Sequence, residues 1–237
     1  MNDYLENDMN LETDMKLEAN IKLEANIKTE IFGMNDSAID NSALEICASF
    51  LKNGKVIAFP TETVYGLGAN ALDEKSCREI YELKGRPANK GLICHLYDPA
   101  QGEEIAYMDK RAYKLFEAFA PGPITVVLKK KSVLGPTVTG GLDTVALRLP
   151  SNNVFIELAK KSGIPIAGTS ANISSQPSPK ECGTVINTFG GRIPAIIDGG
   201  KTSVGIESTI VSLVDKKPFI IRVGAISPQD IAKVIEL

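Results

Sequence analysis

The first place where the sequence could do chemistry is a cluster of polar side chains directly after a short apolar run. The run at 56–59, V-I-A-F, has the β-branched and aromatic residues of a buried strand, and Pro60 ends it because proline has no N–H to give to a ladder. Three side chains able to bond a polar ligand follow it: Thr61, Glu62 and Thr63. Gly66 and Gly68 then indicate a sharp turn or a close approach of the backbone to a ligand. An ordinary strand-to-loop turn is the alternative interpretation.

Cations placed soon after this turn indicate an anionic ligand. They come at the end of a helix predicted over 74–84 and just beyond it: Lys84, Arg86 and Lys90. Further polar groups stand on predicted loops and strand ends later in the chain: Asp143, Thr144, Arg148, Ser170, Asn172, Ser178, Ser208, Thr209 and Arg222. Cations, small hydroxyls and a glycine-rich backbone suit a triphosphate, whose charge several donors must share. Each residue taken alone also has a structural interpretation, but together they predict a nucleotide site.

The single histidine, His95, limits the chemistry available. It excludes a zinc site built on several histidines and a two-histidine mechanism. A Ser-His-Asp triad on His95 stays open, although no G-x-S-x-G motif accompanies it. Because no paired carboxylates and no nucleophile–base pair stand out, positioning and electrostatics are the expected mode of catalysis. The four cysteines are scattered, without a C-x-x-C pair, and predict reduced thiols rather than a structural metal.

The composition is that of an ordinary globular protein. Of 237 residues, 43% are hydrophobic and 23% are charged, and the net charge of −3 argues against a protein that coats nucleic acid. No apolar run approaches the roughly 20 residues that cross a bilayer, and the acidic, polar N-terminus is unlike a signal peptide. We therefore expect a cytoplasmic protein that does not associate with a membrane.

Residues 1–26 differ from the rest of the chain. A six-residue repeat runs through them, with copies such as M-K-L-E-A-N and I-K-L-E-A-N. Its apolar positions alternate as in a strand, whereas Glu and Ala favour helix, and so few short repeats cannot bury a core. We expect a flexible or partly helical tail at 1–26 that carries none of the candidate groups and is dispensable for activity. The catalytic domain is then expected at 27–237.

The body alternates strands with helices, which predicts one α/β domain with no linker after residue 30. Helices are expected between Asp40 and Gly54 and at 74–84, 109–119 and 153–162, with a last one starting at Ser227-Pro228. Strands are expected at 27–32, 56–59, 92–96, 124–129, 145–149, 164–167, 195–197, 209–213 and 219–223. Asp98-Pro99 is interpreted as a turn and 169–180 as a loop.

Arg148 is the one charged residue of the strand predicted at 145–149. Strand alternation puts it on the same face as the small Ala146, with Val145, Leu147 and Leu149 on the other. A charged group on an otherwise apolar strand needs a partner. From the residues alone, a structural ion pair with Asp143 or a nearby Glu is the favoured interpretation.

Several motifs in order carry a family resemblance. They are F-P-T-E-T-V-Y-G-L-G-A-N-A, K-G-R-P, P-G-P-I-T, G-L-D-T-V-A-L-R-L-P, T-S-A-N, P-S-P, D-G-G and G-I-E-S-T-I-V. From about residue 27 to the C-terminus, the chain resembles the YrdC/Sua5 family of L-threonylcarbamoyladenylate synthases. The resemblance implies an open, twisted, mixed α/β sheet with helices around a basic concave groove.

The resemblance also implies an activity. Enzymes of the family condense L-threonine, bicarbonate and ATP with Mg²⁺ to threonylcarbamoyl-AMP and pyrophosphate. A downstream tRNA threonylcarbamoyl-transferase machinery then modifies the adenosine next to the anticodon of certain tRNAs. The implied partners are these small molecules and that machinery, with tRNA or double-stranded RNA as a further candidate.

Carried over position by position, the resemblance assigns roles to named residues. The residues expected to bind threonine are Thr61, Thr63, His95, Arg148, Gly168 and Ser208. The residues expected to bind ATP are Lys84, Arg86, Lys90, Thr144, Ser170, Asn172, Ser178 and Arg222. Lys84, Arg86 and Arg148 are the expected catalytic groups, and in this interpretation the partner of Arg148 is the carboxylate of threonine, clamped by two parallel hydrogen bonds.

The chain also departs from the family pattern. Ala120 stands where Trp often precedes P-G-P, and Lys90-Gly91-Leu92 replaces a frequent Asn-Pro-Leu. Because the sequence ends soon after Arg222, it is expected to match the short YrdC/TsaC branch rather than the longer Sua5 branch. Two other classes stay open: a hydrogenase-maturation carbamoyltransferase, whose acylphosphatase and zinc-finger parts are missing here, and a non-catalytic RNA-binding or ribosome-assembly protein.

Overall fold

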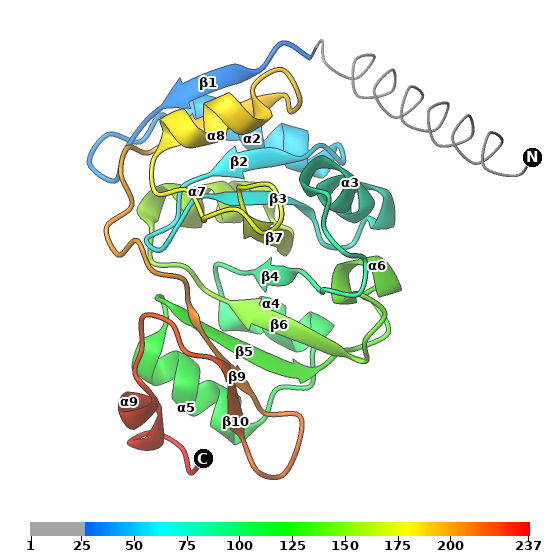
Figure 1. Ribbon diagram of the computed structural model, residues 1–237, viewed down its shortest axis with the longest axis vertical. Helices are drawn as coiled ribbons and strands as arrows, with labels where there is room; N and C mark the ends of the chain where they lie inside the picture. The colour runs from blue at the N-terminus through cyan, green and yellow to red at the C-terminus, as the bar shows by residue number, and fades with distance from the viewer. Residues whose placement is uncertain (1–26) are drawn as a thin grey trace, which may run out of the picture.

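The computed structural model describes residues 27–237, which form one ten-stranded mixed sheet flanked by helices (Figure 1). This confirms the expected α/β class with a single mixed sheet. The tail predicted at 1–26 lies outside the described residues. Within 27–237, no helix is long and apolar enough to cross a membrane.

The strands lie side by side in the order β1-β8-β2-β3-β7-β4-β6-β5-β9-β10. Their bounds are β1 Glu30–Gly33, β2 Ile57–Phe59, β3 Gly66–Asn70, β4 Ile93–His95, β5 Ile124–Lys129, β6 Thr144–Arg148, β7 Ile166–Ser170, β8 Ala195–Asp198, β9 Thr209–Ser212 and β10 Phe219–Arg222. The pairs β1/β8, β2/β8, β4/β6 and β5/β9 are parallel, and the remaining neighbours are antiparallel. Every expected strand is present, and its ends differ from the prediction by at most three residues.

The helices are α2 Asn41–Lys52, α3 Glu74–Lys84, α4 Pro99–Ile105, α5 Lys110–Phe119, α6 Pro136–Thr139, α7 Asn153–Ser162, α8 Cys182–Phe189 and α9 Pro228–Ala232. The predicted caps act as expected. Asp40 accepts hydrogen bonds from the first backbone N–H groups of α2, and Ser227 does the same for α9. Gly85 and Gly163 adopt the left-handed conformation that ends α3 and α7.

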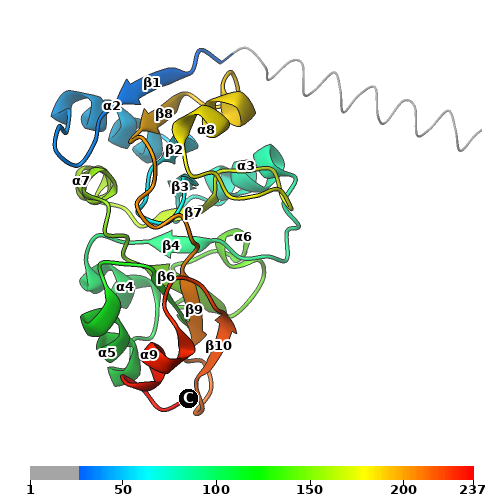
Figure 2. The ribbon, with the colours of Figure 1, turned by 60° about the vertical axis from the view of Figure 1, so that its left-hand side comes forward.

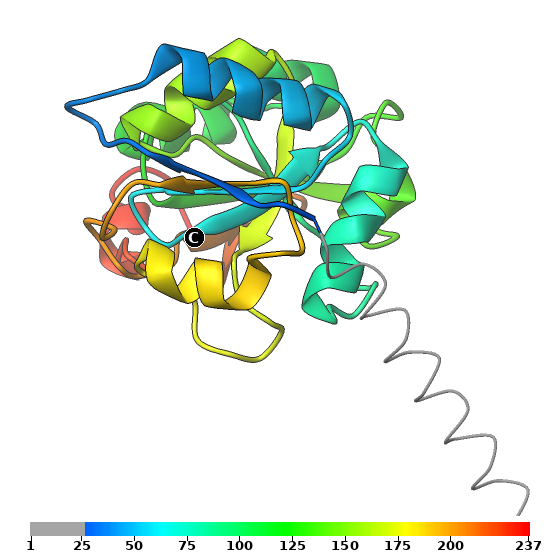
Figure 3. The same cartoon turned by 90° about the horizontal axis from the view of Figure 1, so that it is seen from above.

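Strand alternation divides the apolar side chains between two cores. On one face of the sheet, α2 and α7 pack over β2 and β8, and the rings of Phe59 and Phe155 lie 5.1 Å apart. The opposite core joins α3 and α8 to that end of the sheet and α4 and α5 to β5 and β6. Figures 2 and 3 show α2 and α7 on one side of the twisted sheet and α3 and α8 on the other. The first face is therefore covered at one end, and its other end is open to a ligand.

Gly66 and Gly68 indicated a sharp turn or a close approach of the backbone to a ligand, and the turn is wrong because 66–70 forms the internal strand β3. Its glycines serve packing rather than turning. A Cβ on Gly66 would lie 2.6 Å from the ring of Phe59, and one on Gly68 would lie 2.8 Å from the same ring. Only residues without a side chain fit under this aromatic ring. Because β3 pairs with β7, it also extends β7 to Ser170, beyond the predicted end at 167.

Three helices were not predicted: α4, α6 and α8. Asp98-Pro99 is the N-cap and first residue of α4 rather than a turn, since the Asp98 side chain accepts a hydrogen bond from the N–H of Ala100. The α6 helix has only four residues. The N-cap of α8 is Glu181, whose side chain makes no capping bond, so the start of this helix carries a weak sequence signal.

Candidate active site

The open end of the first sheet face is the floor of a cavity of about 430 Å³. Alternate strand residues line it: Ile93 and His95 of β4, Ala146 and Arg148 of β6, Val127 of β5 and Ile210 of β9. The intervening Val145 and Leu147 belong to the opposite core, so the alternation predicted for β6 is confirmed. The volume lies in the range of roughly 300–1,000 Å³ that small-molecule sites occupy.

The polar turn after β2 is closed by its own hydroxyl groups. Thr61 donates to the carbonyl of Val64 at 2.6 Å, and its Oγ1 lies 2.9 Å from Oγ1 of Thr63. From a distant loop, the N–H of Val204 donates to the carbonyl of Glu62 at 2.8 Å. Both threonines are buried and line the cavity. The turn is therefore ordered by the protein's own contacts, with Thr61 as the residue that shapes it.

Arg148 forms a buried ion pair with Glu62. Its Nη2 donates to Oε1 of Glu62 at 2.6 Å and its Nε donates to the carbonyl of Gly122 at 3.3 Å. The second carboxylate oxygen of Glu62 accepts from the N–H of Ser151. Both side chains of the pair are only 5% exposed. The structural partner expected from the residues alone is thus a nearby Glu, not Asp143, while Nη1 of Arg148 has no hydrogen bond from residues 27–237.

His95 is a buried, neutral imidazole. Its ring meets Phe59 and Phe155 edge-on, with centroids 6.2 and 5.7 Å apart. A Cβ on Gly168 would lie 3.1 Å from the ring, so the glycine leaves room for it. Burial, followed by the charge of Arg148, lowers the pKa of His95 to about 3. Its Nδ1 is buried and has no hydrogen-bond partner among the described residues. No Asp therefore binds this nitrogen there, as a Ser-His-Asp triad would require.

Arg86 lines the cavity on the side of α3. Its Nε donates to the carbonyl of Lys90 at 2.9 Å and its Nη2 donates to that of Gly91 at 2.8 Å. These bonds fix the guanidinium plane, and a further side-chain hydrogen bond joins Arg86 to Tyr81. Lys90 contributes its carbonyl here, and its side chain does not line the cavity.

Lys84 lies behind the cavity wall rather than in it. Its ammonium donates to the carbonyls of Ser170 and Asn172. Burial, followed by the charge of Arg86, lowers the pKa of Lys84 to about 7. The amide of Asn172 donates to the carbonyls of Ile173 and Gln176. Lys84 and Asn172 therefore hold the loop after β7, and through it they position Ser170, which lines the cavity.

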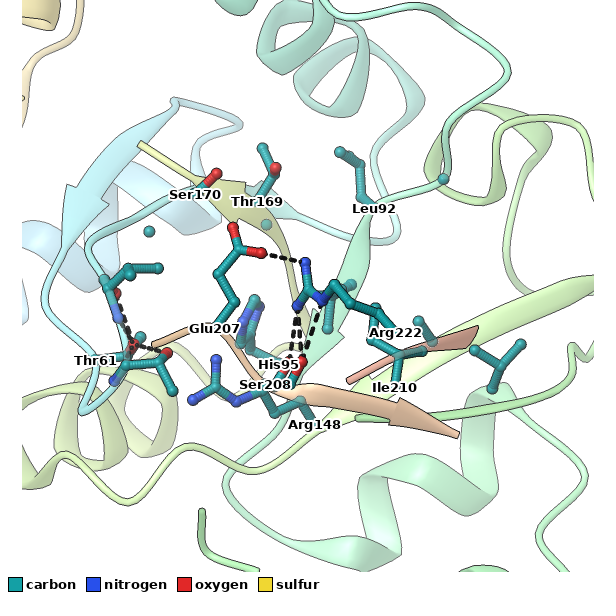
Figure 4. A pocket seen from close by; sticks show the side chains of 18 of the residues that line it. Thr61, Leu92, His95, Arg148, Thr169, Ser170, Glu207, Ser208, Ile210 and Arg222 are labelled. Atoms are coloured by element: carbon teal, nitrogen blue, oxygen red, sulfur yellow. Dashed lines mark hydrogen bonds and ion pairs between the residues drawn. The ribbon is translucent and has the colours of Figure 1, made fainter. Parts of the chain in front are cut away.

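A second arginine–glutamate pair stands at the cavity surface. Nη1 of Arg222 donates to Oε2 of Glu207 at 2.6 Å, and its Nε and Nη2 both donate to the carbonyl of Ser208. The hydroxyl of Ser178 donates to Oε1 of Glu207 at 2.7 Å. Oγ of Ser208 pairs with Oγ1 of Thr125 at 2.7 Å. Figure 4 shows the Glu207 carboxylate and the Arg222 guanidinium facing each other in the cavity.

A comparison with known protein families agrees with these motifs. The Sua5/YciO/YrdC family model, described as "Telomere recombination", matches residues 49–224. The chain belongs to the Sua5/YciO/YrdC family.

Two relatives within the Sua5/YciO/YrdC family have substantial identity. A threonylcarbamoyl-AMP synthase of Pyrococcus abyssi is 46% identical over 198 residues, or 83% of this chain. One of Bacillus subtilis is 42% identical over 209 residues, or 87% of this chain. The matches span only 58% and 59% of these relatives, which are therefore longer than the matched region. A crystal structure of Pyrococcus abyssi Sua5 with L-threonine is 45% identical, with a TM-score of 0.86, and the match covers 88% of this chain and 61% of that one.

Most residues predicted for a Sua5/YciO/YrdC site meet in the one cavity. Its lining includes Thr61, Thr63, Arg86, His95, Thr144, Arg148, Gly168, Ser170, Ser208 and Arg222. Four predicted residues do not line it: Lys84, Lys90, Asn172 and Ser178. Lys84 and Asn172 lie one layer behind, and Ser178 reaches the lining through its bond to Glu207.

The family resemblance assigns no role to two carboxylates of the site. Glu62 stands in F-P-T-E-T and Glu207 in G-I-E-S-T-I-V. An acidic residue between apolar strands is a signal that it has a cationic partner, but sequence alone does not say which cation. In the described part of this Sua5/YciO/YrdC chain, no group of three or more His, Cys, Asp or Glu could hold a metal ion.

Proposed function

We propose that this chain is an L-threonylcarbamoyladenylate synthase. It would join L-threonine, bicarbonate and ATP to form threonylcarbamoyl-AMP and release pyrophosphate. The observation that carries the proposal is one cavity that unites Thr63, His95 and Arg148 with Arg86, Ser170 and Arg222 from separate segments. The identity of 46% to the Pyrococcus abyssi threonylcarbamoyl-AMP synthase supports the same assignment.

In this proposal, threonine binds beside Arg148. The guanidinium is already fixed by Glu62 and Gly122, and its Nη1 edge is available for a carboxylate. The orphaned Nδ1 of His95 offers a hydrogen bond to a polar group of the amino acid. The Pyrococcus abyssi Sua5 structure, solved with L-threonine, supports an amino-acid subsite in this fold.

ATP is proposed to bind across the remaining lining, with its phosphates near Arg86, Ser170 and Arg222. These groups are cationic or carry hydroxyl donors, as a triphosphate requires. Thr144 lines the same region, and Ser178 would add a hydroxyl. Lys90 remains proposed for ATP because its side chain is exposed beside Arg86. Lys84 and Asn172 act as positioning residues, since they fix the loop that carries Ser170.

The proposed reaction needs no protein nucleophile. The amine of threonine adds to bicarbonate with loss of water, giving a carbamate. A carbamate oxygen then attacks the α-phosphorus of ATP, and the bond to the β-phosphate oxygen breaks as pyrophosphate leaves. Arg86 and Arg222 would stabilise the charge that develops on the phosphates, and the fixed cavity would hold the reactants in line.

Magnesium and the larger partners extend the proposal. Mg²⁺ would accompany ATP and neutralise its phosphates, because the described residues offer only the Glu207 carboxylate in the lining and no metal cluster. The product would pass to a tRNA threonylcarbamoyl-transferase machinery in the cytoplasm. Binding of tRNA or double-stranded RNA is a further candidate interaction.

Mass spectrometry tests the activity directly. The protein is mixed with ATP, Mg²⁺, bicarbonate and threonine, and a threonylcarbamoyl-AMP peak is expected. Pyrophosphate release should require both threonine and bicarbonate. RNA binding without any such release would instead favour a non-catalytic RNA-binding protein.

A further inference from the structure

Glu207 holds two of the donors that the proposed function assigns to ATP, Ser178 and Arg222. Its Oε1 accepts the hydroxyl hydrogen of Ser178 at 2.7 Å, and its Oε2 accepts from Nη1 of Arg222 at 2.6 Å. Glu207 lines the cavity together with Arg222 (Figure 4). A carboxylate thus stands where two phosphate donors converge.

These donors have little capacity left for a second anion. A serine hydroxyl has one hydrogen, so Ser178 cannot donate to a phosphate while it donates to Glu207. Nε and Nη2 of Arg222 are directed to Ser208, whose carbonyl accepts from both. The nitrogen of Arg222 that remains for an anion is Nη1, and one of its two hydrogens is directed to Glu207. A phosphate that takes the Ser178 hydroxyl must therefore displace the carboxylate, and a phosphate that binds Nη1 must compete with the carboxylate beside it.

The contact is placed where such displacement is easy. The side chains of Arg222 and Glu207 are 36% and 39% exposed, so an incoming anion reaches them through water. Exposed ion pairs of this kind have small net energies. A triphosphate brings several negative charges against one carboxylate charge, which favours exchange.

We propose that Glu207 is an internal competitor of ATP, occupying Ser178 and Arg222 until the phosphates replace it. It thereby sets the affinity of the site for polyanions. This inference rests on the proposed function, because it takes ATP as the anion that enters. A ligand for a site that is blocked most of the time binds with an apparent Kd raised by the inverse of the open fraction. If Glu207 blocks the donors about four-fifths of the time, as a contact of about 1 kcal/mol would allow, the apparent Kd for ATP is raised about fivefold.

Glu207→Gln tests the competition, because it keeps the size of the side chain and removes its charge. The ATP Kd, measured by calorimetry with and without Mg²⁺, should fall by up to about fivefold relative to the parent. The matched control is Glu157→Gln, which breaks a surface ion pair with Lys160 on α7, outside the cavity lining, and should leave the ATP Kd unchanged. An unchanged or weaker affinity for ATP in Glu207→Gln overturns the proposal. Loss of a metal ligand or of a positioning carboxylate would weaken ATP binding rather than tighten it.

A double variant separates direct competition from a general loss of negative charge. In an Arg222→Gln background, Glu207→Gln should give much less tightening, because its main competitive contact is gone. An equal fall of the ATP Kd in both backgrounds would mean that Glu207 acts only through the electrostatic field of its charge, and would overturn the proposal. Should Glu207→Gln fail to fold, Glu207→Asp serves, since the shorter side chain cannot span both donors. Absence of ATP binding by the parent protein would count against the proposed function itself.

Discussion

The Arg148–Glu62 and Arg222–Glu207 pairs have the same N–O distance of 2.6 Å but very different surroundings. Both side chains of the first pair are 5% exposed, whereas those of the second are 36% and 39% exposed. In the buried pair, each charge has lost its water and depends on the other. In the exposed pair, water solvates each charge when the contact opens. Equal geometry therefore does not mean equal energy.

The difference assigns different roles to the two pairs. Glu62 is a permanent part of the scaffold and aims one edge of Arg148 at the cavity. Glu207 is an exchangeable partner that yields Arg222 to a ligand. The pairs also mark two subsites, because Arg148 adjoins His95 on the strand floor and Arg222 faces the loop residue Ser178 through Glu207. The same kind of substitution made in each pair should therefore have different effects on stability and on ligand binding.

The largest expected difference is in stability. Glu62→Ala leaves Arg148 charged, buried and without its partner, which should lower the free energy of unfolding by about 3–5 kcal/mol. Glu207→Ala removes an exposed pair and should cost only about 0–1 kcal/mol. Urea unfolding of the two variants and the parent measures both values. Similar losses in the two variants would break the comparison.

A smaller effect should appear in ATP binding. Arg86→Ala removes a charged phosphate donor worth roughly 1.5–3 kcal/mol, so the affinity for ATP should fall by about tenfold or more. Threonine binding measured without ATP should change much less, because Arg86 does not contact Arg148 or His95. Calorimetry with each substrate distinguishes the two. A loss confined to threonine would reverse the assignment of the subsites.

Arg148→Lys tests the other subsite. Lysine keeps a charge for Glu62 but has no planar fork, so it cannot bond Glu62 and a ligand carboxylate in the same way. The KM for threonine should rise about tenfold or more, a loss of roughly 1.4 kcal/mol. The affinity for ATP should stay near that of the parent. Arg222→Lys is the matched control and should weaken ATP rather than threonine; parental threonine kinetics in Arg148→Lys would return Arg148 to a purely structural role.

The smallest expected effect comes from pH, because the buried pair lies beside His95. The pKa of this imidazole is about 3 when folded against an ordinary 6.5, so between these values the unfolded chain binds a proton that the folded chain does not. The free energy of unfolding should therefore fall as the pH falls through that window, by about 0.7 kcal/mol between pH 7 and pH 6. His95→Gln should remove that loss in urea titrations. The imidazole is the only one in the chain, so a proton NMR titration midpoint near pH 6.5 in the folded parent would contradict the prediction.

The residues predicted most of the elements that carry the site. Strand alternation predicted the face of the sheet on which Arg148 lies, and Asp40 and Ser227 marked the starts of two helices. The family motifs predicted which polar groups gather in the cavity. Strand β3 was not predicted, because glycines in a sequence indicate a turn. In the structure they are needed because the ring of Phe59 leaves no room for a side chain. Local signals could not supply that information, because it comes from packing between strands.

The sequence did not single out Glu62 among the possible partners of Arg148, or pair Glu207 with Arg222, for a related reason. A carboxylate's partner depends on which distant segments meet, and Arg148 is far from Glu62 in sequence. Lys84 shows the same limit in the opposite direction. Its type and spacing suggest a phosphate ligand, yet its ammonium is directed at the carbonyls of Ser170 and Asn172.

The order of the strands has a consequence for synthesis of the protein on the ribosome. β2 finds its neighbour β8 only after residue 195 has been made, and β5 finds β9 only after residue 209. Arg222, at the end of β10, comes later still. Pairings between distant segments form slowly, and apolar strands that await a partner are prone to aggregate. The emerging chain therefore carries an exposed edge of β2 until residue 195 has been translated, and an exposed edge of β5 until residue 209 has been translated.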